Sequence, residues 1–119
     1  MSPAKRIVRV VGVSFAPGYP QNLHQVAPLA IDASARGEAL AVALRRNPDN
    51  PYDANAIEVH VPAIDAMVGH LPAGVAARLA PLMDQGARIG ADVFTVAIDP
   101  NHPDRPGIEV RVWNMDEAA

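Results

Sequence analysis

The feature that most constrains the fold of this chain is a series of six short strand-like segments, separated by segments rich in proline and glycine. Alternation of apolar with polar or small residues is typical of a strand with one covered face. The twelve prolines and eight glycines leave little room for long regular elements. The predicted strands are residues 6–15, 39–46, 55–61, 66–71, 89–99 and 108–113. The first is apolar and β-branched on both faces, which predicts a strand covered on both sides.

Two other segments have the apolar spacing of a helix. The first, residues 21–35, contains Pro28, which should limit any helix there to short pieces. The second begins at Pro72, which a first helical turn tolerates, and Gly86 is a plausible stop. Pro81 should kink this helix or split it in two.

Two segments are predicted to be loops, because residues 47–53 contain two prolines and residues 100–107 contain three. The resulting order is strand, short helical stretch, three strands, helix and two strands. This order favours a small closed or nearly closed β-barrel over a parallel α/β sheet. We therefore expect a mainly β protein with one domain at residues 6–115, between short tails at 1–5 and 116–119.

Composition excludes several classes of function. A length of 119 residues predicts one domain. The net charge of −3 argues against a protein that coats duplex DNA, because that role needs a basic face. Capture of a strand end, which needs few phosphate contacts, stays open. There is no cysteine, no apolar run of the ~18 residues that span a membrane and no signal-peptide core after the start. A cytoplasmic protein with no membrane partner is the expectation.

Catalytic and metal-binding patterns are weak. The four histidines fall in four different segments without metal-ligand spacing, so no metal site is predicted. Ser14, His70 and Asp53 could form a hydrolytic triad on paper, but no nucleophile elbow surrounds the serine. The glycines form no phosphate-binding loop, so no cofactor is predicted. We expect no catalytic residues, and a small hydrolase or nuclease stays a distant alternative.

The loop segment NPDNPYDANAIEV, residues 47–59, carries more information. Asn, Asp and Pro are the residues that turns use, which explains residues 47–51. A turn requires neither Tyr52 nor Asp53, and only 4% of the chain is aromatic. An aromatic residue at the tip of a loop on a barrel indicates a binding role.

The segments NPYDANAI and VGHLPAGVAARLAPLMDQG resemble the HIRAN domain family, and VVGVSF, ALAVALRR and IEVRVWN fall where that family has strands. The resemblance covers about residues 6–114. It implies a six-stranded barrel related to OB- and SH3-like folds, with one or two flanking helices. It also implies binding of single-stranded DNA at a free 3′-hydroxyl end, in DNA repair or replication. The fork-remodelling members carry a helicase, for which 119 residues leave no room, so we expect a chain of the free-standing bacterial kind.

The resemblance also implies roles for individual residues. Tyr52 would stack on the terminal base, and Asp53 would accept a hydrogen bond from the 3′-hydroxyl. Asn50 would hold the loop or the terminal nucleotide, and His70 would touch a phosphate or sugar. Phe15 could supply a second stacking surface.

Two positions depart from the fork-remodelling members, because Ser14 and Ala73 stand where those carry an arginine and a lysine. Arg45 and Arg46, at the end of the strand that leads into the loop, could replace these cations in part. Any DNA binding should therefore be weak and strongly salt-dependent. The missing cations leave a second hypothesis open, in which the domain keeps its fold but acts as an adaptor for a protein partner.

Overall fold

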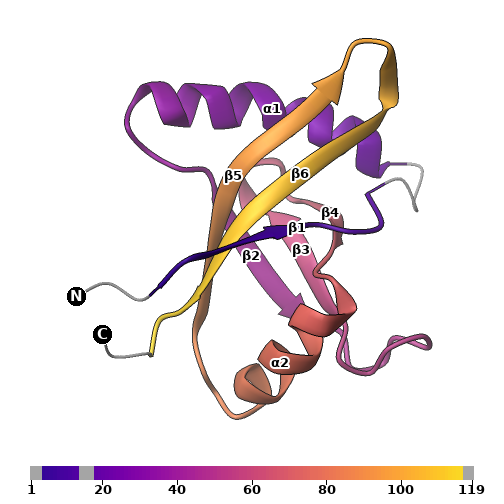
Figure 1. Cartoon of the computed structure of the whole chain (residues 1–119), viewed down its shortest axis with the longest axis vertical. Helices are drawn as coiled ribbons and strands as arrows, with labels where there is room; N and C mark the ends of the chain where they lie inside the picture. The colour runs from indigo at the N-terminus through magenta and orange to yellow at the C-terminus, as the bar shows by residue number, and fades with distance from the viewer. Residues whose placement is uncertain (1–3, 14–17, 117–119) are drawn as a thin grey trace.

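The computed structural model describes residues 4–13 and 18–116, which form one antiparallel sheet of six strands and two α-helices (Figure 1). The strand order in the sheet is β1-β6-β5-β2-β3-β4. The predicted mainly β class with six strands and two flanking helices is confirmed. The strands are β1 (Arg6–Arg9), β2 (Ala41–Arg46), β3 (Ile57–Val61), β4 (Ala66–His70), β5 (Ile89–Asp99) and β6 (His102–Asn114).

The sheet curls into a half-barrel, and a single backbone bridge joins its two edges. Just beyond β1, the Val11 amide donates to the His70 carbonyl at 2.9 Å, and the His70 amide donates to the Val11 carbonyl at 2.9 Å. Gly69 makes this approach possible. With φ at 154°, a Cβ on this residue would lie 2.6 Å from the Val11 carbonyl oxygen, which no side chain tolerates.

The inner face of the curled sheet forms the core. The alternation of buried with less buried residues that a period of two predicts is clearest in β3. Ile57, Val59 and Val61 of β3 are fully buried, while the intervening Glu58 and His60 are not. Each large aliphatic side chain buried in this way contributes about 1.5–3 kcal/mol. The remaining buried strand residues include Val8, Val42, Val68, Val93, Ile108, Val110 and Val112.

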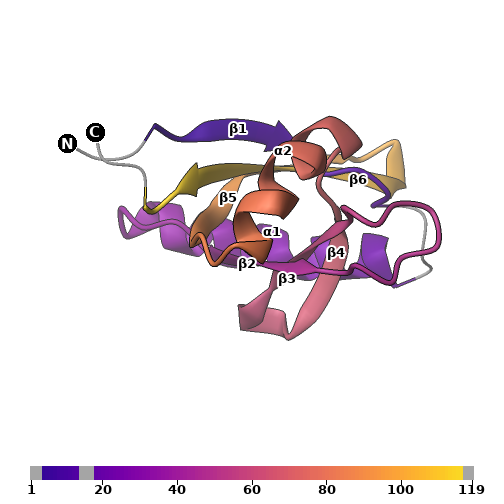
Figure 2. The ribbon, with the colours of Figure 1, turned by 90° about the horizontal axis from the view of Figure 1, so that it is seen from below.

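The two helices cover different parts of the sheet. Helix α1 (Tyr19–Ala35) packs against β4, β5 and β6 and buries Leu23 and Val26. In Figure 2 it lies on one side of the molecule and β1 on the other. Helix α2 (Ala73–Asp84) follows β4 directly and inserts Ala76 and Ala80 into the core. Neither helix of the described ranges has the length and hydropathy needed to cross a bilayer.

The prediction that Pro28 limits the first helix to short pieces is wrong, and Pro81 does not split the second helix. Helix α1 runs without interruption through Pro28, and α2 runs through Pro81. Both prolines are exposed, so each ring faces solvent and removes only one backbone donor. The buried residues on the opposite face of each helix outweigh that loss.

Two strand predictions also need correction. Strand β1 ends at Arg9 and is covered on one side only, because Ile7 is 49% exposed. Strand β6 begins at His102, inside the predicted loop of residues 100–107. Its prolines fall where β6 pairs with β5 alone, since β1 meets β6 only at residues 109–112. Within the described residues, the other edge of β6 is unpaired along this stretch. Proline, which has no backbone N–H to donate to a neighbouring strand, is tolerated at such an edge.

The close approach at Gly69 predicts a large cost for adding a side chain there. Gly69→Ala should destabilise the fold by about 1–3 kcal/mol or more, because the strained backbone adds to the clash with the Val11 carbonyl. Gly74→Ala is the matched control, since a Cβ on Gly74 meets nothing within 4 Å. Urea unfolding of both variants tests this, and equal stability would contradict it.

Candidate nucleic-acid interface

The loop between β2 and β3, residues 47–56, is held together by its own side chains. The Asn50 side-chain oxygen accepts hydrogen bonds from the amides of Tyr52 at 2.9 Å and Asp53 at 3.2 Å. Asp53 Oδ1 accepts one from the Asn55 amide at 2.9 Å. The interpretation that the turn does not need Asp53 is therefore wrong, because one of its two carboxylate oxygens accepts a hydrogen bond within the turn. The Tyr52 side chain makes no hydrogen bond within the described residues.

Arg46 fixes the loop to helix α2. Its guanidinium donates to both carboxylate oxygens of Asp84, at 2.9 and 3.1 Å, and to the carbonyls of Ala54 and Ala56. The hydrogen bond from Arg46 lowers the pKa of Asp84 below its ordinary value of 3.8. All three guanidinium nitrogens are thus engaged. Arg46 therefore has a structural role in holding the loop.

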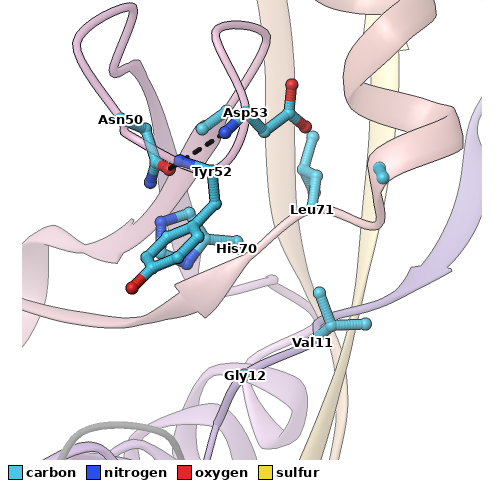
Figure 3. A pocket seen from close by; sticks show the side chains of 9 residues that line it. Val11, Gly12, Asn50, Tyr52, Asp53, His70 and Leu71 are labelled. Carbon is cyan, nitrogen blue, oxygen red and sulfur yellow. Dashed lines mark hydrogen bonds between the residues drawn. The ribbon is translucent and has the colours of Figure 1, made fainter.

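An open pocket of about 330 Å³ lies where this loop meets the bridge that joins the sheet edges (Figure 3). The loop supplies Tyr52, whose side chain is 89% exposed. In Figure 3 the Tyr52 ring and the Asp53 carboxylate leave the loop in different directions. The pocket is lined by Val11, Gly12, Asn50, Tyr52, Asp53, Ala56, His70, Leu71 and Ala73.

The lining residues define what the pocket can bind. Val11, Leu71 and the alanines are apolar, and Tyr52 offers an exposed aromatic ring. Asp53 Oδ2 accepts no hydrogen bond within the described residues, so it is available to a donor on a ligand. None of the described residues that line the pocket is a lysine or arginine. The arrangement suits a flat ring that carries a hydroxyl group, and it disfavours a phosphate beside Asp53.

The structure brings together four of the seven residues predicted from the sequence. Asn50, Tyr52, Asp53 and His70 all line the pocket, whereas Phe15 lies outside the described residues. The other two predicted residues, Arg45 and Arg46, do not line it.

Arg45 occupies the outer face of the sheet. It is exposed and makes no hydrogen bond or ion pair within the described ranges. In the strand register it pairs with Glu58, which in turn pairs with His70. Cross-strand partners share a face, so Arg45 lies on the same face as His70, two strands away.

Sequence reasoning missed the apolar floor of the pocket. Val11, Gly12 and Leu71 attract no notice in a sequence, because their places depend on the bridge between residues 59 positions apart in the chain. Gly12 has a positive φ of 73°, so a glycine just past a strand was the one available signal.

Comparison with known proteins agrees with this architecture. The family model of the HIRAN domain matches residues 7–114. The HIRAN domain of human HLTF superposes with a TM-score of 0.58 at 27% identity, over 95% of this chain and 78% of that one. A Lactobacillus plantarum protein gives a TM-score of 0.68 at 27% identity, over 95% and 97% of the two chains. No curated protein matches the sequence significantly.

The contacts of Arg46 predict that its loss loosens the loop. In Arg46→Gln the backbone amides of residues 50–56 should exchange with solvent at least about tenfold faster, since hydrogen bonds to a charged group contribute about 1.5–3 kcal/mol. Hydrogen exchange measured by NMR tests this. Arg45→Gln, which changes the neighbouring charge without touching the loop, should leave these rates unchanged. Equal effects of the two variants would contradict the structural role of Arg46.

The lowered pKa of Asp84 predicts a pH dependence of stability. A carboxyl group whose pKa is lower in the folded state stabilises the fold above its unfolded pKa, and this contribution disappears as pH falls through the folded pKa. The wild-type protein should therefore be more stable than Asp84→Asn at pH 7, and the difference should shrink below about pH 4. Urea unfolding at pH 7 and pH 3 measures this. A difference independent of pH would contradict it.

Proposed function

This chain belongs to the HIRAN domain family, and from that premise we propose that it is a non-catalytic module that binds single-stranded DNA at a free 3′-hydroxyl end. HIRAN domains are known as DNA-binding modules. The observation that carries the proposal is the pocket, which is lined by both an almost fully exposed tyrosine and a carboxylate with an available oxygen. Free 3′ ends arise in DNA repair and replication, and we propose that the domain acts there, in the cytoplasm.

Tyr52 provides the affinity in this proposal. Its ring is exposed and its backbone is fixed by the bond to Asn50, so stacking on a base orders little beyond the side chain. Stacking of this kind contributes about 1–3 kcal/mol per base and tolerates any sequence. Phe15 would add a second stacking surface, as its place in the sequence suggests.

Asp53 provides the preference for an end. One carboxylate oxygen is already bound to the Asn55 amide, which orients the group and leaves Oδ2 to accept from a hydroxyl. A 3′-hydroxyl can donate such a bond. A phosphate at that position, internal or terminal, cannot donate and would be repelled by the negative charge.

The remaining residues position the nucleotide. The backbone of His70 is held by the bridge to Val11, so its ring is well placed to contact a sugar or phosphate. Asn50 acts through the loop that it holds. Arg46 acts indirectly, by holding the same loop to α2, while the exposed Arg45 can approach a phosphate.

An adaptor function is the second candidate, in which the pocket takes a protein partner. It is favoured by the absence of any cation among the pocket residues and by the net charge of −3. Phosphate binding depends on such cations. Purification of a protein partner after nuclease treatment, together with no binding of any DNA, would support this candidate over the first.

The proposal predicts a difference between two chemically similar strand ends. At low salt, fluorescence anisotropy should show tighter binding of a labelled single strand that ends in a 3′-hydroxyl than of the same strand with a 3′-phosphate. Equal binding of the two would exclude end recognition by Asp53.

Two variants separate the contributions of the pocket residues. Tyr52→Ala should weaken binding of both strands about 5- to 150-fold, as expected for the loss of one stacked base. Asp53→Asn retains an oxygen to accept from the Asn55 amide but removes the charge, so it should bind the 3′-phosphate better and reduce the preference.

A further inference from the structure

We infer that the strand held in the pocket continues along a groove between β1 and α2, where Arg6 and Arg78 bind its phosphates. The inference rests on the proposed function, which leaves the rest of the strand unplaced. Because the pocket itself contains no cation, phosphates beyond the terminal nucleotide need positive charge from another part of the surface.

A second depression, of about 340 Å³, lies between the start of β1 and helix α2. Among the described residues that line it there is no carboxylate, and the two charged ones are both arginines. Arg6 and Arg78 are exposed, and neither forms an ion pair within the described residues. The depression is lined by Ala4, Arg6, Val75, Arg78, Leu79, Leu82, Val112, Trp113 and Asn114.

The same two segments connect this groove to the pocket. The chain that supplies Arg6 to the groove reaches Val11 and Gly12 in the pocket five and six residues later. Helix α2 likewise begins in the pocket at Ala73 and contributes Arg78 to the groove. Figure 1 shows β1 crossing the molecule just above α2, and Figure 2 places the two together as well. Five extended residues span roughly 16 Å, which is about five stacked nucleotides at about 3.4 Å each.

Arg78 lies close to the rim of the pocket. It is one helical turn after Gly74, and its Nε donates to the Gly74 carbonyl at 3.5 Å. A bond this long is weak, so the guanidinium stays available to a phosphate. Gly74 follows Ala73, a residue of the pocket lining. Arg78 can therefore meet the first phosphates after the terminal nucleotide.

The groove residue Trp113 also contacts a third cation, Lys5, which lies outside the groove lining. Trp113 packs on Gly90, where a Cβ would lie 2.4 Å from the ring. The Lys5 ammonium lies 4.4 Å from the centre of the same ring. Aromatic rings next to cations are the usual surface for single strands.

The alternative path along the outer faces of β2, β3 and β4 is less favourable. A strand on that path would run from His70 to Arg45 and would cross Glu58, which lies between them in the register. Glu58 is held in place by hydrogen bonds from His60 and Asn47. Its carboxylate would repel phosphates, whereas no such group is among the described residues that line the groove between β1 and α2.

The test measures binding of 3′-hydroxyl strands of two, four, six and ten nucleotides to the full chain. Wild-type affinity should rise from two to about six nucleotides and then level off. The double variant Arg6→Gln/Arg78→Gln should bind the dinucleotide normally but the longer strands about five- to thirtyfold more weakly, as expected for two exposed charge contacts. Its plot of log affinity against log salt should be shallower by about 1.4, at about 0.7 per phosphate contact.

Arg36→Gln/Arg105→Gln is the matched control, because it removes two exposed arginines outside the groove. It should retain wild-type binding at every length, and melting curves should show all variants folded. An unchanged salt dependence in the groove variant would overturn the inference. So would loss of the length effect in Arg45→Gln instead, or binding of an acidic peptide in the groove in place of DNA.

The outcomes separate this inference from the proposed function. If long strands bind through Arg6 and Arg78 but show no preference for a 3′-hydroxyl, the groove stands and end capture fails. If the preference is present and Tyr52→Ala weakens binding as predicted, but the groove variant behaves as wild type, end capture is supported and the groove is excluded.

Discussion

The bridge between Val11 and His70 is the interaction on which the rest of this structure depends. It joins the two edges of the sheet through a pair of 2.9 Å backbone hydrogen bonds, so the curled half-barrel has no free edge at that point. It also creates the pocket, because Val11 and His70 are both lining residues. The requirement for glycine at position 69 follows directly, since any Cβ there would collide with the Val11 carbonyl. The same bridge therefore both closes the sheet and forms part of the pocket.

The loop next to the bridge combines structure and recognition in the same residues. Asn50 and Asp53 make the turn with their side chains, and Arg46 ties it to α2. These bonds hold the backbone of Tyr52 while its ring stays in solvent. A ring presented on a fixed backbone loses less conformational entropy when it binds than one on a mobile loop. In our proposal this smaller loss of entropy compensates in part for the lack of cations among the described pocket residues.

Charge is distributed unevenly around the site, although the chain as a whole is acidic. The pocket contains a carboxylate and no cation, and the sheet face beyond His70 contains Glu58. Among the described residues that line the groove between β1 and α2, the charged ones are both arginines. Net charge alone argues against binding to nucleic acid, but a strand responds to local charge within about a Debye length. A short single strand needs only a few favourable contacts in the right order.

The sequence by itself determined the strands, the two helical segments and the loop that carries Tyr52, because these follow from local periodicity and turn chemistry. It also pointed to Asn50, Tyr52, Asp53 and His70 through an uncommon motif. Only the tertiary structure decided that Pro28 stays within a helix, that Arg46 is structural and that Val11 lines the pocket. Each of these three outcomes depends on contacts with residues that are distant in the sequence. Local patterns cannot contain that information, because hydrogen bonds and burial between distant segments outweigh intrinsic preference.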